Sequence, residues 1–136
     1  MHPVLRNILA VLAGIVAGWI VNMGLIMLTA KLMPPPAGVD VNDIASINAH
    51  IHEYSFAQLL MPFLAHALGT FAAGFVVARF AASRQLVLAL ALGVFFLLGG
   101  IVAVSMIPNA PLWFDVLDLV VAYLPMAWLG ARLGFK

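Results

Sequence analysis

The residue best suited to do chemistry in this sequence is His66. It lies within 25 consecutive residues that carry no formal charge, between Glu53 and Arg79. A helix that begins near Phe56 places His66 roughly 15 Å below the membrane surface, at about 1.5 Å per residue, and so near the midplane. An ionisable side chain at that depth is a candidate functional site. The alternative is a neutral histidine that only hydrogen-bonds a neighbouring helix.

Other polar residues are predicted near His66. Asn22 and Tyr123 lie at a similar depth in their own helices, so the three residues are compatible with one polar layer. Gln58 and Pro62 precede His66 at four-residue steps on the same helix face, and Pro62 has no N–H to donate to the carbonyl of Gln58. Depth does not establish contact, because nothing in the sequence sets the rotation of each helix.

Asp118 is the second ionisable candidate, about one and a half turns into the fourth predicted helix. Carboxylates near a helix N-terminus are favoured by the helix dipole and free amides, which explains Asp115 and Asp118 without transport. On a continuous helix, Tyr123 is turned about 140° from Asp118. We therefore favour the helix-end interpretation and expect no relay from Asp118 through Tyr123.

A third group, His50, His52 and Glu53, has the residue types of a metal site. Helical positions two apart point about 200° from each other, so His50 and His52 cannot bind one ion from a helix, whereas His50 and Glu53 can. In an extended chain the two histidines would share a side. Because the surrounding pattern favours a helix, we interpret them as surface residues, with a metal site at His50, His52 and Glu53 as the weaker alternative, and we expect no cofactor.

The spacing of the charged residues predicts the helices that carry these side chains. Runs of 24, 25 and 30 residues without a formal charge are followed by a shorter one of 13. The chain is 65% hydrophobic and 8% charged, with a mean hydropathy of +1.16. A helix needs roughly 20 apolar residues to cross a bilayer. We predict a single all-α domain over residues 1–136, a bundle of four transmembrane helices at about 8–30, 56–78, 86–107 and 112–133.

The basic residues predict the orientation of the bundle. Five of the six lie on one side of the predicted spans, and Lys31 is the exception. The positive-inside rule then places both termini in the cytoplasm. The outer loop, about residues 32–55, repeats Ile44, Ile47, Ile51 and Tyr54 at helical intervals, so we expect a short amphipathic helix there, on the membrane surface or over the bundle mouth. A plain connector is the alternative.

Small residues recur at four-residue spacing in three stripes. Such stripes let helices approach closely within a membrane, either inside this bundle, which we favour, or between copies of the chain. Their members are Ala10, Gly14 and Gly18 on the first helix, Ala65, Gly69 and Ala73 on the second, and Gly130 and Gly134 at the end of the chain.

Several segments resemble a group of small, uncharacterised four-helix bacterial membrane proteins. They are Arg6-Asn7-Ile8-Leu9-Ala10, the Pro-Pro-Pro-Ala-Gly-Val-Asp loop at 34–40, Phe63-Leu64-Ala65-His66-Ala67-Leu68-Gly69-Thr70, Pro111-Leu112-Trp113-Phe114-Asp115 and Tyr123-Leu124-Pro125-Met126. The resemblance covers nearly the whole chain. It implies a multi-pass protein of the bacterial cytoplasmic (inner) membrane and makes His66 part of a motif, but it implies no activity.

Two functions fit these observations, and a third is a less favoured alternative. The first is a packing or interaction module in the lipid bilayer, as a homo-oligomer or as an accessory subunit of a larger membrane complex. The second is a small transporter or channel for protons, ions or a small solute that uses His66. The third is a membrane enzyme acting on a lipid or quinone, which no catalytic motif supports. The net charge of +1 points to no nucleic-acid partner.

Overall fold

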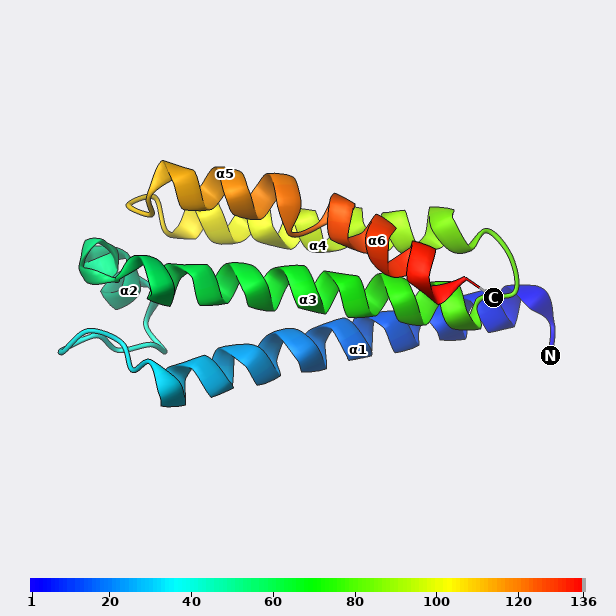
Figure 1. Ribbon diagram of the computed structural model, residues 1–136, viewed down its shortest axis with the longest axis horizontal. Helices are drawn as coiled ribbons and strands as arrows, with labels where there is room; N and C mark the ends of the chain where they lie inside the picture. The colour runs from blue at the N-terminus through cyan, green and yellow to red at the C-terminus, as the bar shows by residue number, and fades with distance from the viewer. Residues whose placement is uncertain (136) are drawn as a thin grey trace.

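The computed structural model describes residues 1–135 and consists of helices, with no β-strand in that range. In chain order the elements are α1 (Pro3–Leu32), α2 (Ile44–His50), the 3-10 helix η1 (Ile51–Glu53), α3 (Phe56–Phe80), α4 (Gln85–Met106), α5 (Leu112–Val121) and α6 (Leu124–Gly134). The long helices run side by side as a bundle (Figure 1). We call the end where α1 begins and α6 ends the terminal end, and the end that carries α2 the loop end.

Four segments of the described chain are long and apolar enough to cross a membrane: Pro3–Leu32, Phe56–Phe80, Gln85–Met106 and Leu112–Gly134. The prediction of an all-α protein with four such segments is confirmed. The first helix begins at Pro3 rather than near residue 8. Proline suits the first position of a helix, where no N–H is needed, and the side chain of His2 accepts a hydrogen bond from the Val4 N–H.

The fourth segment differs from the prediction because it is two helices rather than one. α5 ends at Val121 and α6 begins at Leu124, with Ala122 and Tyr123 in a turn between them. Pro125 lies at the start of α6, has no N–H to donate to the carbonyl of Val121, and its ring would clash with that carbonyl in a continuous helix. The break changes the direction in which Tyr123 projects.

The helices α1 and α3 pack through their small-residue stripes. A Cβ atom at Gly18 would lie 2.9 Å from the carbonyl oxygen of Gly69, and one at Gly69 would lie 2.8 Å from that of Gly18. A Cβ at Gly14 would lie 2.6 Å from a methyl carbon of Val77 and 3.0 Å from the Ala73 carbonyl oxygen. The two backbones therefore touch, as expected for membrane helices joined by small residues.

The third stripe, Gly130 and Gly134 of α6, packs against the side of α3 that faces away from α1. A Cβ at Gly134 would lie 2.5 Å from the Phe75 carbonyl oxygen, and one at Gly130 would collide with the backbone of Phe71. Gly74 of α3 meets the Ala127 carbonyl in the same way. The packing glycines of all three stripes thus lie at interfaces within the chain itself.

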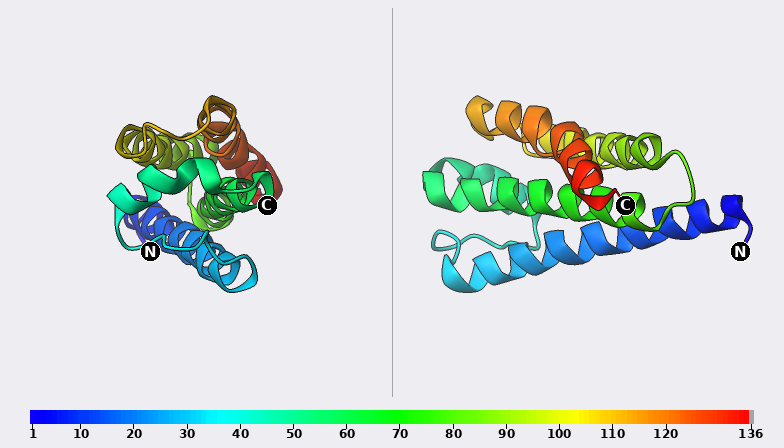
Figure 2. Two further views of the ribbon diagram at one scale, coloured as in Figure 1. Left: turned by 90° about the vertical axis from the view of Figure 1, so that its left-hand side faces the viewer. Right: turned by 45° about the vertical axis from the view of Figure 1, so that its right-hand side comes forward.

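Hydrogen bonds close both ends of the bundle. At the terminal end, Arg6 Nε donates to the Phe80 carbonyl at 2.7 Å, and the Asn7 side chain bonds the turn between α3 and α4. At the loop end, Asn48 of α2 forms two hydrogen bonds with Asn109, from Asn109 N to Oδ1 at 2.9 Å and from Asn109 Nδ2 to the carbonyl at 3.2 Å. Figure 2 (left) shows α2 lying across this end. Its position relative to a membrane stays a prediction.

Candidate polar site in the bundle

The side chains of His66, Asp118 and Tyr123 meet in the middle of the bundle, and we call them the His66 cluster. His66 Nδ1 lies 2.8 Å from Asp118 Oδ1, and the Tyr123 hydroxyl donates to Asp118 Oδ2 at 3.0 Å. The same hydroxyl is 3.3 Å from His66 Nδ1, and the two rings stack with centroids 5.9 Å apart. Asp118 is only 2% exposed, so three residues from α3, α5 and the α5–α6 turn form one buried network.

The hydrogen bonds define the roles of the atoms in the cluster. An ionised carboxylate only accepts hydrogen bonds, so we assign the imidazole proton to Nδ1, where it is donated to Asp118. The other ring nitrogen, Nε2, has no hydrogen-bond partner among residues 1–135. Neutral His66 therefore keeps a free lone pair on Nε2, and 23% of its side chain remains exposed. This nitrogen is available to a proton or to a donor group of a ligand.

The break in the fourth span explains why Tyr123 reaches Asp118. The angle of about 140° between these positions holds only for a continuous helix, and the backbone of Tyr123 departs from helical geometry, with φ −109° and ψ −80°. The expectation that Tyr123 cannot connect to Asp118 is therefore wrong. The helix-end interpretation of Asp118 is wrong as well, because both of its carboxylate oxygens accept from side chains of the cluster.

A pocket of about 210 Å³ adjoins the cluster. α1, α3 and α4 provide its walls, and Tyr123 completes it. It is lined by Gly18, Asn22, His66, Gly69, Thr70, Phe96, Gly99, Gly100, Ala103 and Tyr123. Two larger hollows of about 580 Å³ lie on the outside of the bundle and have mostly apolar linings. In the described chain, the pocket beside His66 thus combines an ionisable group with uncharged polar ones.

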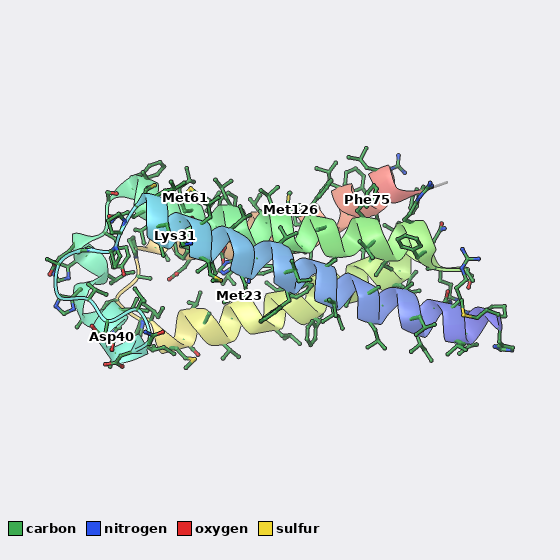
Figure 3. The ribbon with its side chains drawn as sticks, turned by 90° about the horizontal axis from the view of Figure 1, so that it is seen from below. Met23, Lys31, Asp40, Met61, Phe75 and Met126 are labelled. Atoms are coloured by element: carbon green, nitrogen blue, oxygen red, sulfur yellow. The ribbon has the colours of Figure 1, made fainter. Side chains whose placement is uncertain are left out.

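The pocket owes its shape to the crossing of α1 and α4. Figure 3 shows these helices crossing and then diverging toward the loop end, with Met23 labelled on the diverging part of α1. Gly18 and Phe96 mark the crossing, since a Cβ at Gly18 would lie 3.0 Å from the Phe96 ring. On the other wall, a Cβ at Gly100 would lie 2.5 Å from the Tyr123 hydroxyl. Glycine at that position therefore makes room for the phenol.

Asn22 lies in the same pocket, as its depth suggested, but it does not bond to the cluster. Its side-chain oxygen is buried without a hydrogen-bond partner in the part of the chain that the structure describes. Burying an unpaired amide group costs about 1–3 kcal/mol. The site therefore has polar hydrogen-bonding capacity that the protein does not use.

Thr70 and Gly100 belong to the site but were not among the predicted residues. The Thr70 hydroxyl donates to the His66 carbonyl at 2.8 Å, which leaves its oxygen lone pairs free. Its position four residues after His66 on one helix face is a signal that the sequence does contain. Gly100 has no comparable signal, because its role depends on how α4 packs against Tyr123.

Gln58 lies apart from the His66 cluster, in the first turn of α3. Its side-chain oxygen accepts from the Ser55 N–H at 2.8 Å, forming a capping box, and its Nε2 donates to the Pro34 carbonyl at 2.8 Å. The amide is thus fully engaged in joining the loop to the start of α3. Asp115 also lies outside the cluster, one turn before Asp118 in the first turn of α5.

The loop histidines do not converge on a single point. His50 Nδ1 lies 2.9 Å from the Ser46 carbonyl oxygen, within α2, and His52 is paired only with the adjacent Glu53 at 3.8 Å. Across the described residues, no group of three or more histidine, cysteine, aspartate or glutamate side chains is arranged to hold a metal ion. The structure therefore offers no metal centre of that kind at His50, His52 and Glu53.

Comparisons with known proteins leave the site to be interpreted from its own geometry. The resemblance to small four-helix bacterial membrane proteins stays a prediction. Models of protein families, curated proteins and solved structures yielded no match to this chain.

Proposed function

We propose that this chain is a small membrane transporter in which His66 carries a proton through the apolar part of the bundle. One observation carries the proposal: His66 is held by buried Asp118 and Tyr123, its second ring nitrogen has no hydrogen-bond partner among residues 1–135, and the residue lines a polar pocket. Ionisable groups are costly inside a bilayer, and those that occur there often mark ion or proton pathways.

The packing of the helices also supports transport over an interaction module. The glycines that would provide a surface for association are used between α1, α3 and α6 of the same chain. Packing alone does not account for an ionisable pair beside a pocket, because apolar side chains of similar volume are often as stabilising as a buried ion pair.

The pocket volume bears on the enzyme alternative. About 210 Å³ is below the roughly 300–1,000 Å³ of typical sites for drug-sized ligands. A proton, water or a small solute fits this space better than a lipid or quinone does. We therefore do not extend the proposal to catalysis.

We further propose that the protein lies in the bacterial cytoplasmic membrane with the terminal end in the cytoplasm. Arg6 lies in the first turn of α1, Arg79 in the last turn of α3, Arg84 at the start of α4 and Arg132 in the last turn of α6. These arginines gather at the terminal end, as the positive-inside rule requires of a cytoplasmic face. The proposed path then runs from the pocket toward the loop end, where α2 covers the bundle.

Proton flux through proteoliposomes tests the proposal. Vesicles that contain the purified full chain and a trapped pH-sensitive dye are subjected to a potassium diffusion potential. We expect an internal pH change that is faster than in empty vesicles and that His66→Ala abolishes. His50→Ala, which removes a loop histidine, is the matched control and should leave the flux unchanged. A folded His66→Ala variant with full flux, or wild-type flux equal to that of empty vesicles, would refute the proposal.

A second candidate, association with another membrane chain, is favoured by one glycine that the bundle does not use. A Cβ at Gly24 of α1 would meet no described atom within 4 Å. Small residues left facing lipid provide a surface where another helix can pack closely. Native mass spectrometry of the particle released by mild detergent tests this, with Gly24→Leu expected to dissociate it. A monomer in mild detergent would rule the candidate out.

A further inference from the structure

We propose that the pocket beside His66 binds a small ammonium-type cation, ammonium itself or a short alkylammonium, in exchange for the proton on His66. This inference rests on the proposed transport function and names its substrate class. It draws on the charge around the pocket, on the hydrogen-bonding atoms in its wall and on the pairing of His66 with Asp118.

The charge around the pocket favours a cation. Asp118 is hydrogen-bonded to the imidazole, and with His66 neutral its negative charge is not balanced by a cationic side chain among residues 1–135. α4 has no charged residue between Gln85 and Met106. The charged residues of α1, Arg6 and Lys31, lie near its ends, and Lys31 is nine residues from Asn22, about 13 Å along a helix. A bound cation would complete the charge balance that Asp118 leaves open.

The polar atoms of the pocket suit a ligand that donates hydrogen bonds. His66 Nε2 offers a lone pair, the Thr70 hydroxyl has already donated its proton to the His66 carbonyl, and the Asn22 amide has no partner in the described structure. An ammonium group brings several N–H donors to such acceptors. Phe96 adds an aromatic side chain to the wall, and aromatic rings attract cations.

The same wall disfavours other ligands. Among residues 1–135 no lysine or arginine lines the pocket, so an anion would find no permanently cationic side chain there. Hard metal cations such as Ca²⁺ and Mg²⁺ prefer six or more oxygen ligands, whereas this pocket is lined largely by glycine, alanine and phenylalanine. A small organic cation matches both the polar groups and the apolar ones.

The exchange follows from the valence of Nε2. Its single lone pair can hold a proton or accept an N–H of the ligand, but not both. A proton must therefore leave Nε2 for water before the cation binds, and one positive charge replaces another beside Asp118. The titratable groups that face His66 are Asp118 and Tyr123. α1 and α4 contribute none, and Asp115 lies one turn farther along α5.

Binding of radiolabelled methylammonium to the full-length protein in detergent tests the proposal. We expect saturable binding that tightens as the pH rises, by up to about tenfold per pH unit, because one proton is released per cation bound. Asp118→Asn should weaken binding at least tenfold. Asp115→Asn makes the same chemical change outside the pocket and should bind normally. Tetramethylammonium, which has the charge but no N–H, should not compete.

The outcomes separate this inference from the transport proposal. pH-independent methylammonium binding, equal competition by tetramethylammonium, or displacement by sodium or potassium ions alone would overturn it. If Asp118→Asn does not fold, Asn22→Leu and Phe96→Leu must weaken binding instead, and normal binding in both would overturn it. Proton flux that depends on His66 without methylammonium binding would refute the substrate class and leave transport standing. Methylammonium binding without proton flux would refute the transport proposal and leave the ligand class standing.

Discussion

His66 Nδ1 and Asp118 Oδ1 lie 2.8 Å apart and join α3 to α5 across the interior of the bundle. The two residues are 52 positions apart in the chain, and the carboxylate is almost fully buried. A buried carboxylate requires partners, and in this structure it has two, His66 and Tyr123. The pair therefore joins two helices of the fold through the proposed site.

Removing one member of the pair should destabilise the protein strongly. His66→Leu leaves Asp118 with one partner fewer, and loss of a buried pair by removing one side typically costs about 3–5 kcal/mol. The double variant His66→Leu/Asp118→Leu should recover part of that loss, because no buried charge then remains. Reversible unfolding in mixed micelles measures both free energies. Equal stability of the wild type and His66→Leu would contradict the described network.

The Tyr123 hydroxyl should contribute measurably to stability. Tyr123→Phe removes its hydrogen bond to Asp118 but keeps the ring, and a hydrogen bond to a charged group contributes about 1.5–3 kcal/mol. Tyr54→Phe is the control, because no hydrogen bond of the Tyr54 hydroxyl occurs among the described residues. The same unfolding measurement applies, and an equal effect of both variants would show that the Asp118 bond is not stabilising.

Two glycines of α1 should respond oppositely to the addition of a methyl group. Gly18→Ala inserts a carbon 2.9 Å from the Gly69 carbonyl oxygen and should cost about 1–3 kcal/mol. Gly24→Ala meets nothing within 4 Å of its new carbon in the described structure and should be neutral or stabilising by up to about 1 kcal/mol, the helix propensity difference. Thermal unfolding of the two variants distinguishes these results. Similar destabilisation by both would argue against the described α1–α3 interface.

The hydrogen bonds between Asn48 of α2 and Asn109 of the α4–α5 turn should restrict the motion of residues 40–55. Asn48→Ala removes the Oδ1 acceptor of the Asn109 N–H, and should accelerate amide hydrogen exchange over residues 40–55 several-fold. Asn42→Ala changes a side chain that is not hydrogen-bonded in the described structure and should have no such effect. Hydrogen-exchange mass spectrometry reads out both. Unchanged exchange in Asn48→Ala would indicate that the link does not hold α2.

Tyr54 should make stability depend on pH at the alkaline end. Burial raises the pKa of this phenol, which lies outside the spans, above its usual value of 10.0. The folded state therefore holds the proton more tightly than the unfolded state, and stability should fall as pH rises above about 10. The chain has two tyrosines, so absorbance titration of Tyr123→Phe reports Tyr54 alone. A titration midpoint at or below 10 would contradict the partly buried position of the phenol.

The residues themselves were sufficient to predict several parts of this protein. The runs without charge predict four segments that can cross a membrane. A charged side chain is costly in hydrocarbon, and this cost does not depend on how the helices pack against one another. Counting residues also placed Asn22, His66 and Tyr123 at one depth, since the rise of a helix is constant. The pocket contains all three.

Tertiary structure decided which of these residues meet. The rotation of each helix depends on contacts with its neighbours, such as Gly18 against Gly69, and local sequence does not set it. The largest difference between the predicted and the observed helices arises at Pro125, at the start of α6. A proline in a membrane helix produces either a kink or a break, depending on what surrounds it. Here the chain breaks, and this brings Tyr123 back to Asp118 and completes the network around His66.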